Sequence, residues 1–161
     1  MQYSDIIFGD QNEWEVASGV PHIPFEALDA DYEIDKEAYQ KYFRKMHQLF
    51  PKCKKMLMAV RNQIASSHHT LSGLLYDAVE DQLYTTRIYD IEPIVDPMGV
   101  GDAFIAAYIH AHQKWGDKNQ YCLDFSLSAS AIKNTVPGDQ NLVTEEEIIN
   151  NMTSSGGRIQ R

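Results

Sequence analysis

Cysteine is scarce in this chain. Its two cysteines, Cys53 and Cys122, lie far apart, and no Cys-x-x-Cys pair occurs. Small secreted folds that rely on disulfides carry more cysteines than this. A structural zinc site also needs more ligands at closer spacing. We therefore expect both thiols to be buried and reduced, in a protein held together by its hydrophobic core.

Positive charge is in deficit as well. The chain has 14 Lys and Arg residues against 23 Asp and Glu residues, which gives a net charge of −9. Such a surface repels the phosphates of nucleic acids, so we expect no nucleic-acid partner. A single nucleotide is not excluded, because backbone amides at a helix N-terminus can hold a phosphate even in an acidic protein.

Long hydrophobic runs are missing too. No apolar stretch approaches the roughly 20 residues that a membrane-spanning helix requires. The first ten residues, MQYSDIIFGD, contain no basic residue, unlike the start of a signal peptide. We therefore expect a cytoplasmic protein without a membrane partner. Its 161 residues, 43% of them hydrophobic, are enough for a single domain over residues 1–161.

Strand-like and helix-like segments alternate along the chain. Strands are expected at 5–8, 56–60 and 94–95, with a hairpin formed by 74–76 and 83–89. Helices are expected at 12–18, 35–50, 102–114 and 121–134, and after the capping box that begins at Thr144. Within the helix at 102–114, Phe104, Ile105, Tyr108 and Ile109 are expected to face inward. Residues 153–161 are expected to form a flexible tail. This order predicts an α/β fold with a mostly parallel sheet flanked by helices.

The segment Asp96-Pro97-Met98-Gly99-Val100-Gly101-Asp102-Ala103-Phe104 carries the strongest chemical signal. It places two glycines at the end of a strand and the start of a helix, where unpaired N–H groups and the helix dipole favour an anion. Asp102 stands beside that position and can accept a proton from an attacking hydroxyl. The same pattern also suits an ordinary turn with a helix cap. It is not a Walker A loop, because no Lys-Ser/Thr pair follows.

This segment resembles the DTxGAGDxF signature of ribokinase-like (PfkB family) carbohydrate kinases. The matching positions are Asp96, Gly99, Gly101, Asp102 and Phe104, whereas Pro97 and Val100 depart from the usual form. The resemblance implies a ribokinase-like three-layer sandwich and ATP as phosphoryl donor. It also implies that the amides of Gly99, Val100 and Gly101 form an anion hole. Asp102 is then the catalytic base that contacts the sugar hydroxyl.

A second segment, Asp10-Gln11-Asn12-Glu13, resembles the family's N-x-x-E motif, with Asp10 in place of the usual Asn. The resemblance implies that Glu13 and Asp10 help to position Mg²⁺ through water. Without the resemblance, the same residues describe the solvated acidic start of a helix.

Five further site residues are implied by the resemblance. Arg61 and Asn62 follow the strand at 56–60, where the family has a loop over the nucleotide. Ser130 and Asn134 belong to a helix that borders the adenine in the family, although its small residues equally suit close helix packing. Asp139 lies in a segment, Asn134 to Thr144, that looks most like 2-keto-3-deoxygluconate kinases, and it is assigned to the sugar acid.

The resemblance extends over residues 5–150, whereas family members are about twice as long as this chain. It therefore implies a C-terminal half without the usual sugar site and lid. One hypothesis is an ATP-dependent kinase for a sugar or keto sugar acid, with 2-keto-3-deoxygluconate as the expected substrate. The alternative is an inactive nucleotide-binding fragment. Either form would expose a sheet edge, which predicts self-association or pairing with a missing N-terminal half.

Overall fold

A computed structural model describes residues 1–25, 32–154 and 158–159. The strands are β1 (Ile6–Gly9), β2 (Lys55–Ala65), β3 (His68–Asp77), β4 (Gln82–Thr85), β5 (Tyr89–Ile91) and β6 (Arg158–Ile159). The helices are α1 (Gln11–Ser18), α2 (Lys36–Leu49), α3 (Val100–Trp115), α4 (Asn119–Lys133) and α5 (Glu145–Thr153). No helix in these ranges is both long and apolar enough to cross a membrane.

One mixed sheet organises the fold. Its strand order is β1-β2-β3-β5-β6, and β4 pairs with β3 beside this path. β1 is parallel to β2 and β5 is parallel to β6, whereas β3 runs antiparallel to β2, β4 and β5. The α/β class is confirmed, but the expectation of a mostly parallel sheet is wrong. Short turns join β2 to β3 and β3 to β4, and turns of that length allow only antiparallel neighbours.

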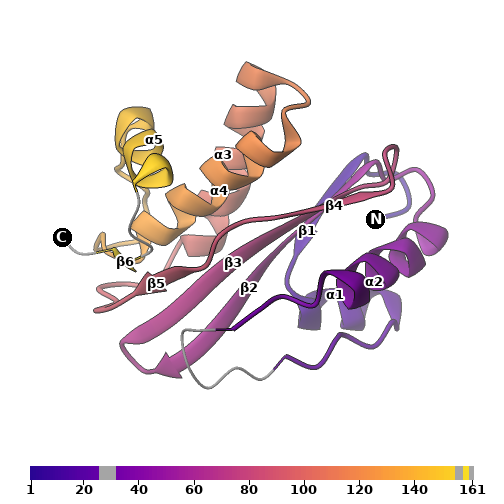
Figure 1. Ribbon diagram of the computed structural model, residues 1–161, viewed down its shortest axis with the longest axis horizontal. Helices are drawn as coiled ribbons and strands as arrows, with labels where there is room; N and C mark the ends of the chain where they lie inside the picture. The colour runs from indigo at the N-terminus through magenta and orange to yellow at the C-terminus, as the bar shows by residue number, and fades with distance from the viewer. Residues whose placement is uncertain (26–31, 155–157, 160–161) are drawn as a thin grey trace.

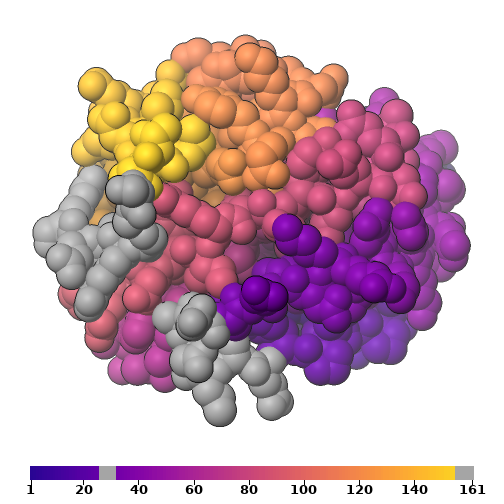
Figure 2. Space-filling view, viewed as in Figure 1, coloured from indigo at the N-terminus to yellow at the C-terminus, as the bar shows by residue number. Residues whose placement is uncertain are grey.

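Helices cover both faces of the sheet, which makes three layers (Figure 1). α1 and α2 lie on one face, and α3, α4 and α5 lie on the other. The two cores follow from the alternation of side chains along β2, where Leu57 joins the α3–α4 core while Met56 and Met58 join the α2 core. In the space-filling view, the described residues of the first 50 and the C-terminal helices accordingly lie on different sides of the molecule (Figure 2).

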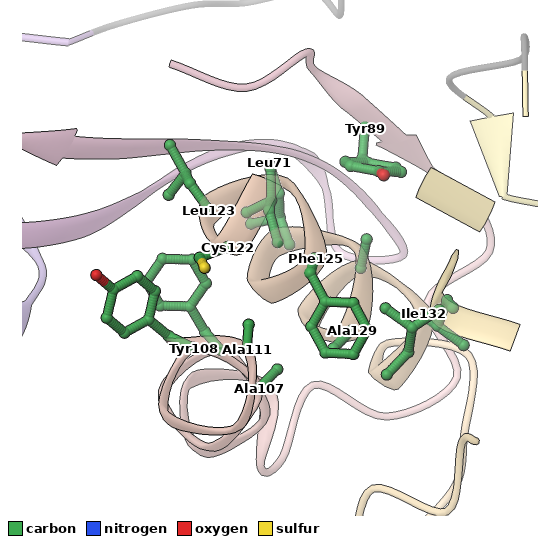
Figure 3. Packing of buried hydrophobic residues seen from close by; sticks show 14 of the residues in the cluster. Leu71, Tyr89, Ala107, Tyr108, Ala111, Cys122, Leu123, Phe125, Ala129 and Ile132 are labelled. Carbon is green, nitrogen blue, oxygen red and sulfur yellow. The ribbon is translucent and has the colours of Figure 1, made fainter. Parts of the chain in front are cut away.

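Close contact between α3 and α4 builds the larger core, in which Ala107 and Ala111 of α3 lie near Cys122 and Phe125 of α4 (Figure 3). The serines of α4 tighten this contact. Ser126 Oγ donates to the carbonyl oxygen of Phe104 at 2.5 Å, and Ser130 Oγ donates to that of Val100 at 3.0 Å. Because the two serines are one helical turn apart, they bond to two successive turns of α3. The small residues of α4 thus serve close helix packing.

The segment 61–70 is a β-hairpin, not the expected loop. β2 continues to Ala65, and β3 begins at His68. The ladder pairs Arg61 with Leu71 and Gln63 with His69, with an irregularity before Ala65. This end of the hairpin extends beyond the helices (Figure 1). The loop was implied by the family resemblance, but the polar residues here continue the strand, because strand residues without a helix above them need no apolar side chains.

The helix starts agree with the sequence-based expectation. Asp10 and Thr144 each form a capping box, and Asp35 caps α2. The expected strand at 94–95 is wrong, because the strand of this region is β5 and ends at Ile91. Pro93 lies two residues after the end of β5 and lacks the N–H that a ladder needs.

A buried polar cluster joins the sheet to the start of α4. The Lys55 ammonium donates to Asp117 Oδ1 at 2.7 Å and to Asn119 Oδ1 at 2.8 Å. Asp77 accepts from Asn119 Nδ2 at 2.8 Å and from the backbone N–H groups of Val79 and Glu80. The side chains of Lys55 and Asp77 are only 8% and 6% exposed, whereas that of Asp117 is 80% exposed. The cluster therefore depends on Asp77 more than on Asp117.

We predict that Asp77→Ala lowers the free energy of unfolding by about 3–5 kcal/mol, because it leaves a buried ammonium and three donors without this acceptor. Asp117→Ala removes the exposed partner of the same lysine and should cost clearly less. Urea denaturation followed by circular dichroism compares the two variants. Equal losses would show that burial does not set the strength of this cluster.

Candidate active site

Contact between aromatic rings brings the end of β1 to the start of α3. The ring of Phe8 meets that of Tyr108 edge-on, with centroids 5.6 Å apart, and that of Phe104 with centroids 6.5 Å apart. Phe8 is followed by Gly9 and Asp10, and Phe104 is preceded by Gly101 and Asp102. The packing therefore places two segments that lie about 90 residues apart in the sequence on either side of one space.

That space is a pocket of about 320 Å³. Its walls come from β1, α1, β2 and α3, and its lining residues are Phe8, Gly9, Asp10, Glu13, Ala59, Gly101, Asp102, Phe104 and Ile105. The two motifs that the sequence singled out thus meet in one pocket. Three carboxylates, those of Asp10, Glu13 and Asp102, line it together with apolar surface.

The capping box at α1 orients two of these carboxylates. Asp10 Oδ1 accepts from the backbone N–H of Glu13, and Glu13 Oε2 accepts from that of Asp10, both at 2.9 Å. The box uses one oxygen of each carboxylate. Gly9 is needed just before it, because a Cβ there would lie 2.1 Å from Nε1 of Trp14. The acidic helix start is therefore a structural cap that also faces the pocket.

The N-terminus of α3 supplies amides on the opposite wall. Gly99 precedes the helix with φ of 73°, and no side chain caps this end. Val100, Gly101 and Asp102 form the first turn, in which backbone N–H groups have no intrahelical acceptor. A Cβ at Gly101 would meet nothing within 4 Å, so the backbone here is open to an approaching group. Asp102 itself is exposed. This arrangement suits an anion beside a carboxylate.

The loop that leads into α3 is braced from behind. Asp96 Oδ1 accepts from the backbone N–H of Met98 at 3.0 Å, and Oδ2 accepts from that of Gly138 at 2.8 Å. These two bonds, helped by the nearby Lys133 ammonium, hold the pKa of Asp96 below its ordinary value of 3.8. The carbonyl oxygen of Asn134 accepts from the N–H groups of Val95 and Asp96. Asp96 therefore fixes the loop to the turn after α4.

Ser130 and Asn134 lie behind this loop, and both are buried. The hydroxyl of Ser130 donates to the carbonyl oxygen of Val100. The side-chain amide of Asn134 donates to the backbone carbonyl oxygen of Ser130. In the structure, these two predicted nucleotide-binding residues therefore lie behind the loop, where their hydrogen bonds connect α4 to the start of α3. Asp139 is exposed beyond it and contacts Gly99 through its backbone, since a Cβ on Gly99 would lie 2.0 Å from the Asp139 carbonyl oxygen.

Arg61 and Asn62 lie on opposite faces of β2. Arg61 is exposed and shares the face of Ala59, which lines the pocket about 6.7 Å along the strand. Asn62 is buried and faces the other way, because its register partner is Thr70, which bonds to Tyr32 on the α2 side. The structure brings Arg61 to the pocket side of the sheet and does not bring Asn62 there.

Five lining residues were not singled out as site residues from the sequence, namely Phe8, Gly9, Ala59, Phe104 and Ile105. Phe8, Phe104 and Ile105 are apolar walls, and Ala59 leaves room on β2. The sequence could have indicated Ala59, because it is the one small side chain in the strand Met56-Leu57-Met58-Ala59-Val60. Ile109, which was expected to face inward, is instead 47% exposed.

The carboxylates of the pocket could hold Mg²⁺ only together with other ligands. Among the described residues, no group of three or more acidic, cysteine or histidine side chains could hold a metal by itself. Mg²⁺ keeps several waters and commonly takes one or two carboxylates together with substrate phosphates. Asp10 and Glu13, each with a second carboxylate oxygen outside the capping box, fit that role.

Gly99 and Gly101 allow a matched test of the loop. We predict that Gly99→Ala lowers the free energy of unfolding by about 2 kcal/mol or more, because of its positive φ and the close Asp139 carbonyl. Gly101→Ala adds the same methyl group in open space and should leave stability nearly unchanged. Thermal and urea unfolding of both variants provides the measurement. Similar losses at both positions would contradict the geometry.

The lowered pKa of Asp96 predicts a pH dependence. A carboxyl whose pKa is lower in the folded state stabilises the fold fully above its unfolded pKa, and this contribution is lost as the pH falls through the folded value. The stability gap between the wild type and Asp96→Asn should therefore be constant near neutral pH and shrink below about pH 4. Urea unfolding across acidic pH measures it. A gap that does not change with pH would contradict this role of the carboxylate.

Neither models of protein families nor the sequences of curated proteins yield a match to this chain. Solved structures do. The 2-dehydro-3-deoxygluconokinase of Thermotoga maritima is 26% identical with a TM-score of 0.80, and the match covers 95% of this chain and 42% of that one. A PfkB family carbohydrate kinase of Listeria grayi is 24% identical with a TM-score of 0.75, and the match covers 93% and 41%.

The ribokinase of Arabidopsis thaliana, whose structure contains ribose and ATP, is 21% identical with a TM-score of 0.69, and the match covers 96% and 42%. The chain thus spans about two fifths of the length of these kinases. The shared architecture and the two motifs, brought together in one pocket, agree with the resemblance seen in the sequence. The chain therefore has the ribokinase-like fold of PfkB family carbohydrate kinases, over about two fifths of the length of those chains.

Proposed function

We propose that this chain carries the phosphoryl-transfer site of an ATP-dependent sugar kinase. The observation that supports this most strongly is the shared pocket, in which an uncapped helix N-terminus faces two carboxylates of α1 and Asp102 stands at the helix start. Phosphoryl transfer needs positioning and charge stabilisation more than covalent chemistry from the protein. Amides and carboxylates in this arrangement supply both.

In the proposed reaction, the sugar hydroxyl gives its proton to the carboxylate of Asp102. Its oxygen forms a bond to the γ-phosphorus of ATP as the bond to the β-phosphate oxygen breaks, and ADP leaves. The N–H groups at Gly99, Val100 and Gly101 stabilise the negative charge that grows on the transferring group. Gly101 is suited to this role because the phosphoryl group can approach its backbone without a side chain in the way.

The acidic side of the pocket has a separate role. Asp10 and Glu13 would orient Mg²⁺ through its bound waters, and the capping box holds both carboxylates in place for this. Bound Mg²⁺ would neutralise phosphate charge. Without it, three carboxylates would repel a nucleotide triphosphate, so we expect nucleotide binding to require the metal.

For the acceptor we propose a sugar or keto sugar acid, with 2-keto-3-deoxygluconate as the first choice. A kinase of the same compound, under its name 2-dehydro-3-deoxygluconate, is among the structural neighbours. Arg61 and Asp139 flank the pocket region on the β2 side and the loop side, and we assign them to nucleotide and substrate, respectively. We expect this reaction to take place in the cytoplasm.

An inactive nucleotide-binding fragment is the second candidate. It is favoured by the length of the chain, which spans only 42% of the Thermotoga kinase and of the ribokinase. In this case the loop before α3 would still bind Mg-ADP, while no sugar would be phosphorylated.

We predict that Asp102→Asn reduces sugar-dependent ADP release by a factor of about 10² or more, because the variant cannot accept the proton. Mg-ADP should still raise the melting temperature of this variant as it does that of the wild type, since the amides are unchanged. Glu146→Gln, an exposed acidic position on α5, is the matched control for loss of one charge.

Each outcome separates the two candidates. ADP release that needs both 2-keto-3-deoxygluconate and Asp102 supports the kinase. A melting-temperature shift with Mg-ADP but no release with any family sugar supports the fragment. No shift with millimolar Mg-ADP would overturn both, and equal turnover in Asp102→Asn would overturn the role of this carboxylate.

A further inference from the structure

Lys133, the last residue of α4, carries a charge in the interior of the protein. The residue is 0% exposed. Its ammonium donates to the backbone carbonyl oxygen of Val136 at 3.0 Å, and it forms no salt bridge with any described residue. Burial of an ammonium without a carboxylate partner is unfavourable, because the ion loses its hydration. The presence of a lysine at this position therefore needs an explanation.

A second buried lysine, Lys55, shows how such a charge is usually compensated. Its ammonium lies 2.7 Å from Asp117 and 3.8 Å from Asp77, and Asn119 is a further acceptor. Lys133 has a carbonyl oxygen in place of these carboxylates. Replacement of a buried charge by a well-packed apolar side chain is often neutral or stabilising. Stability of the fold therefore does not explain the charge at Lys133.

Lys133 closes the turn that follows α4. The N–H of Val136 donates to the backbone carbonyl oxygen of Lys133 at 3.1 Å, and the carbonyl oxygen of Val136 accepts from the ammonium. In the same turn, the carbonyl oxygen of Asn134 accepts from the N–H of Asp96 at 3.2 Å. The N–H of Gly138 donates to Asp96 Oδ2 at 2.8 Å. The turn that Lys133 closes thus holds both the backbone and the side chain of Asp96.

Asp96 connects this turn to the loop that leads into α3. Its Oδ1 accepts from the N–H of Met98, and Gly99 follows as the last residue before the helix. The pKa of Asp96 is lowered by the bonds from Met98 and Gly138 and, to a smaller extent, by the Lys133 ammonium. The lysine is therefore near enough to act on Asp96 by its charge as well as through the turn. A shift of the turn would reach the start of α3 by way of Asp96.

We propose that Lys133 is a positioning residue for phosphoryl transfer, an inference that rests on the proposed kinase function. Its ammonium holds the carbonyl oxygen of Val136, the turn holds Asp96, and Asp96 holds the loop whose amides face the transferring group. These amides must be in place before negative charge develops on that group. The effect of Lys133 therefore falls on the transition state more than on substrate binding. Because it is fully buried, Lys133 acts through the loop and does not touch the substrate.

The test compares Lys133→Met with Lys133→Gln in the 161-residue chain, assayed with Mg-ATP and 2-keto-3-deoxygluconate. The two replacement side chains are equally long, but only Gln keeps a donor for the carbonyl oxygen of Val136. In protein that circular dichroism shows to be folded, Lys133→Met should lower kcat about tenfold or more and change KM less than about threefold. Lys133→Gln should recover part of the lost kcat. Lys118→Met is the matched control, because it removes an exposed lysine at the other end of α4 and should keep the wild-type kcat.

Hydrogen exchange tests the same contacts without catalysis. The amides of Asp96 and Gly138 should exchange faster in Lys133→Met than in the wild type, and at the wild-type rate in Lys118→Met. Unchanged kcat in folded Lys133→Met, equal losses in Lys133→Met and Lys133→Gln, or unchanged exchange of these amides would each overturn the proposal. Absence of sugar-dependent turnover in the wild type would instead contradict the proposed function, while the exchange rates would still show whether Lys133 holds the loop.

Discussion

The contact of the Phe8 ring with Phe104 and Tyr108 is the interaction on which the candidate site depends. β1 contributes only four residues, and β2 is its one strand partner among the described residues. Without the aromatic contact, nothing in the ladder would determine where α3 lies relative to the end of β1. With it, the amides of one segment face the carboxylates of the other, although each segment by itself is an ordinary helix start.

The walls of the pocket are held in different ways. The α1 wall is held by its own capping box, a local device within four residues. The α3 wall is held by distant groups, since Asp96 bonds to Gly138 and Ser130 bonds to Val100. A cap formed within four residues keeps its geometry when distant parts of the chain are changed. The loop before α3, in contrast, depends on the packing of α4 against α3, so its geometry is sensitive to the core (Figure 3).

Part of the apolar surface beside β1 stays uncovered among the described residues. The groove there is lined mainly by apolar residues of β1, α1 and α3. Ile109, four residues after Ile105 on α3, is 47% exposed. Burial of apolar surface of this kind is favourable, so this side of the molecule contributes less to stability than the two packed cores.

The sequence by itself determined the helix starts, the α/β class and the two motifs, because caps, periodicity and glycines act over a few residues. Asp35 and Thr144 cap their helices as expected, and the structure adds Asp10 as the cap of α1. Only the tertiary structure decided that the sheet is mixed, that residues 61–70 form a hairpin, and that Asn62 lies away from the pocket. It also showed that the side chains of Ser130 and Asn134 form hydrogen bonds behind the loop that leads into α3. These outcomes depend on which strands pair and on which face each side chain meets, and such long-range contacts leave no short-range pattern in the chain.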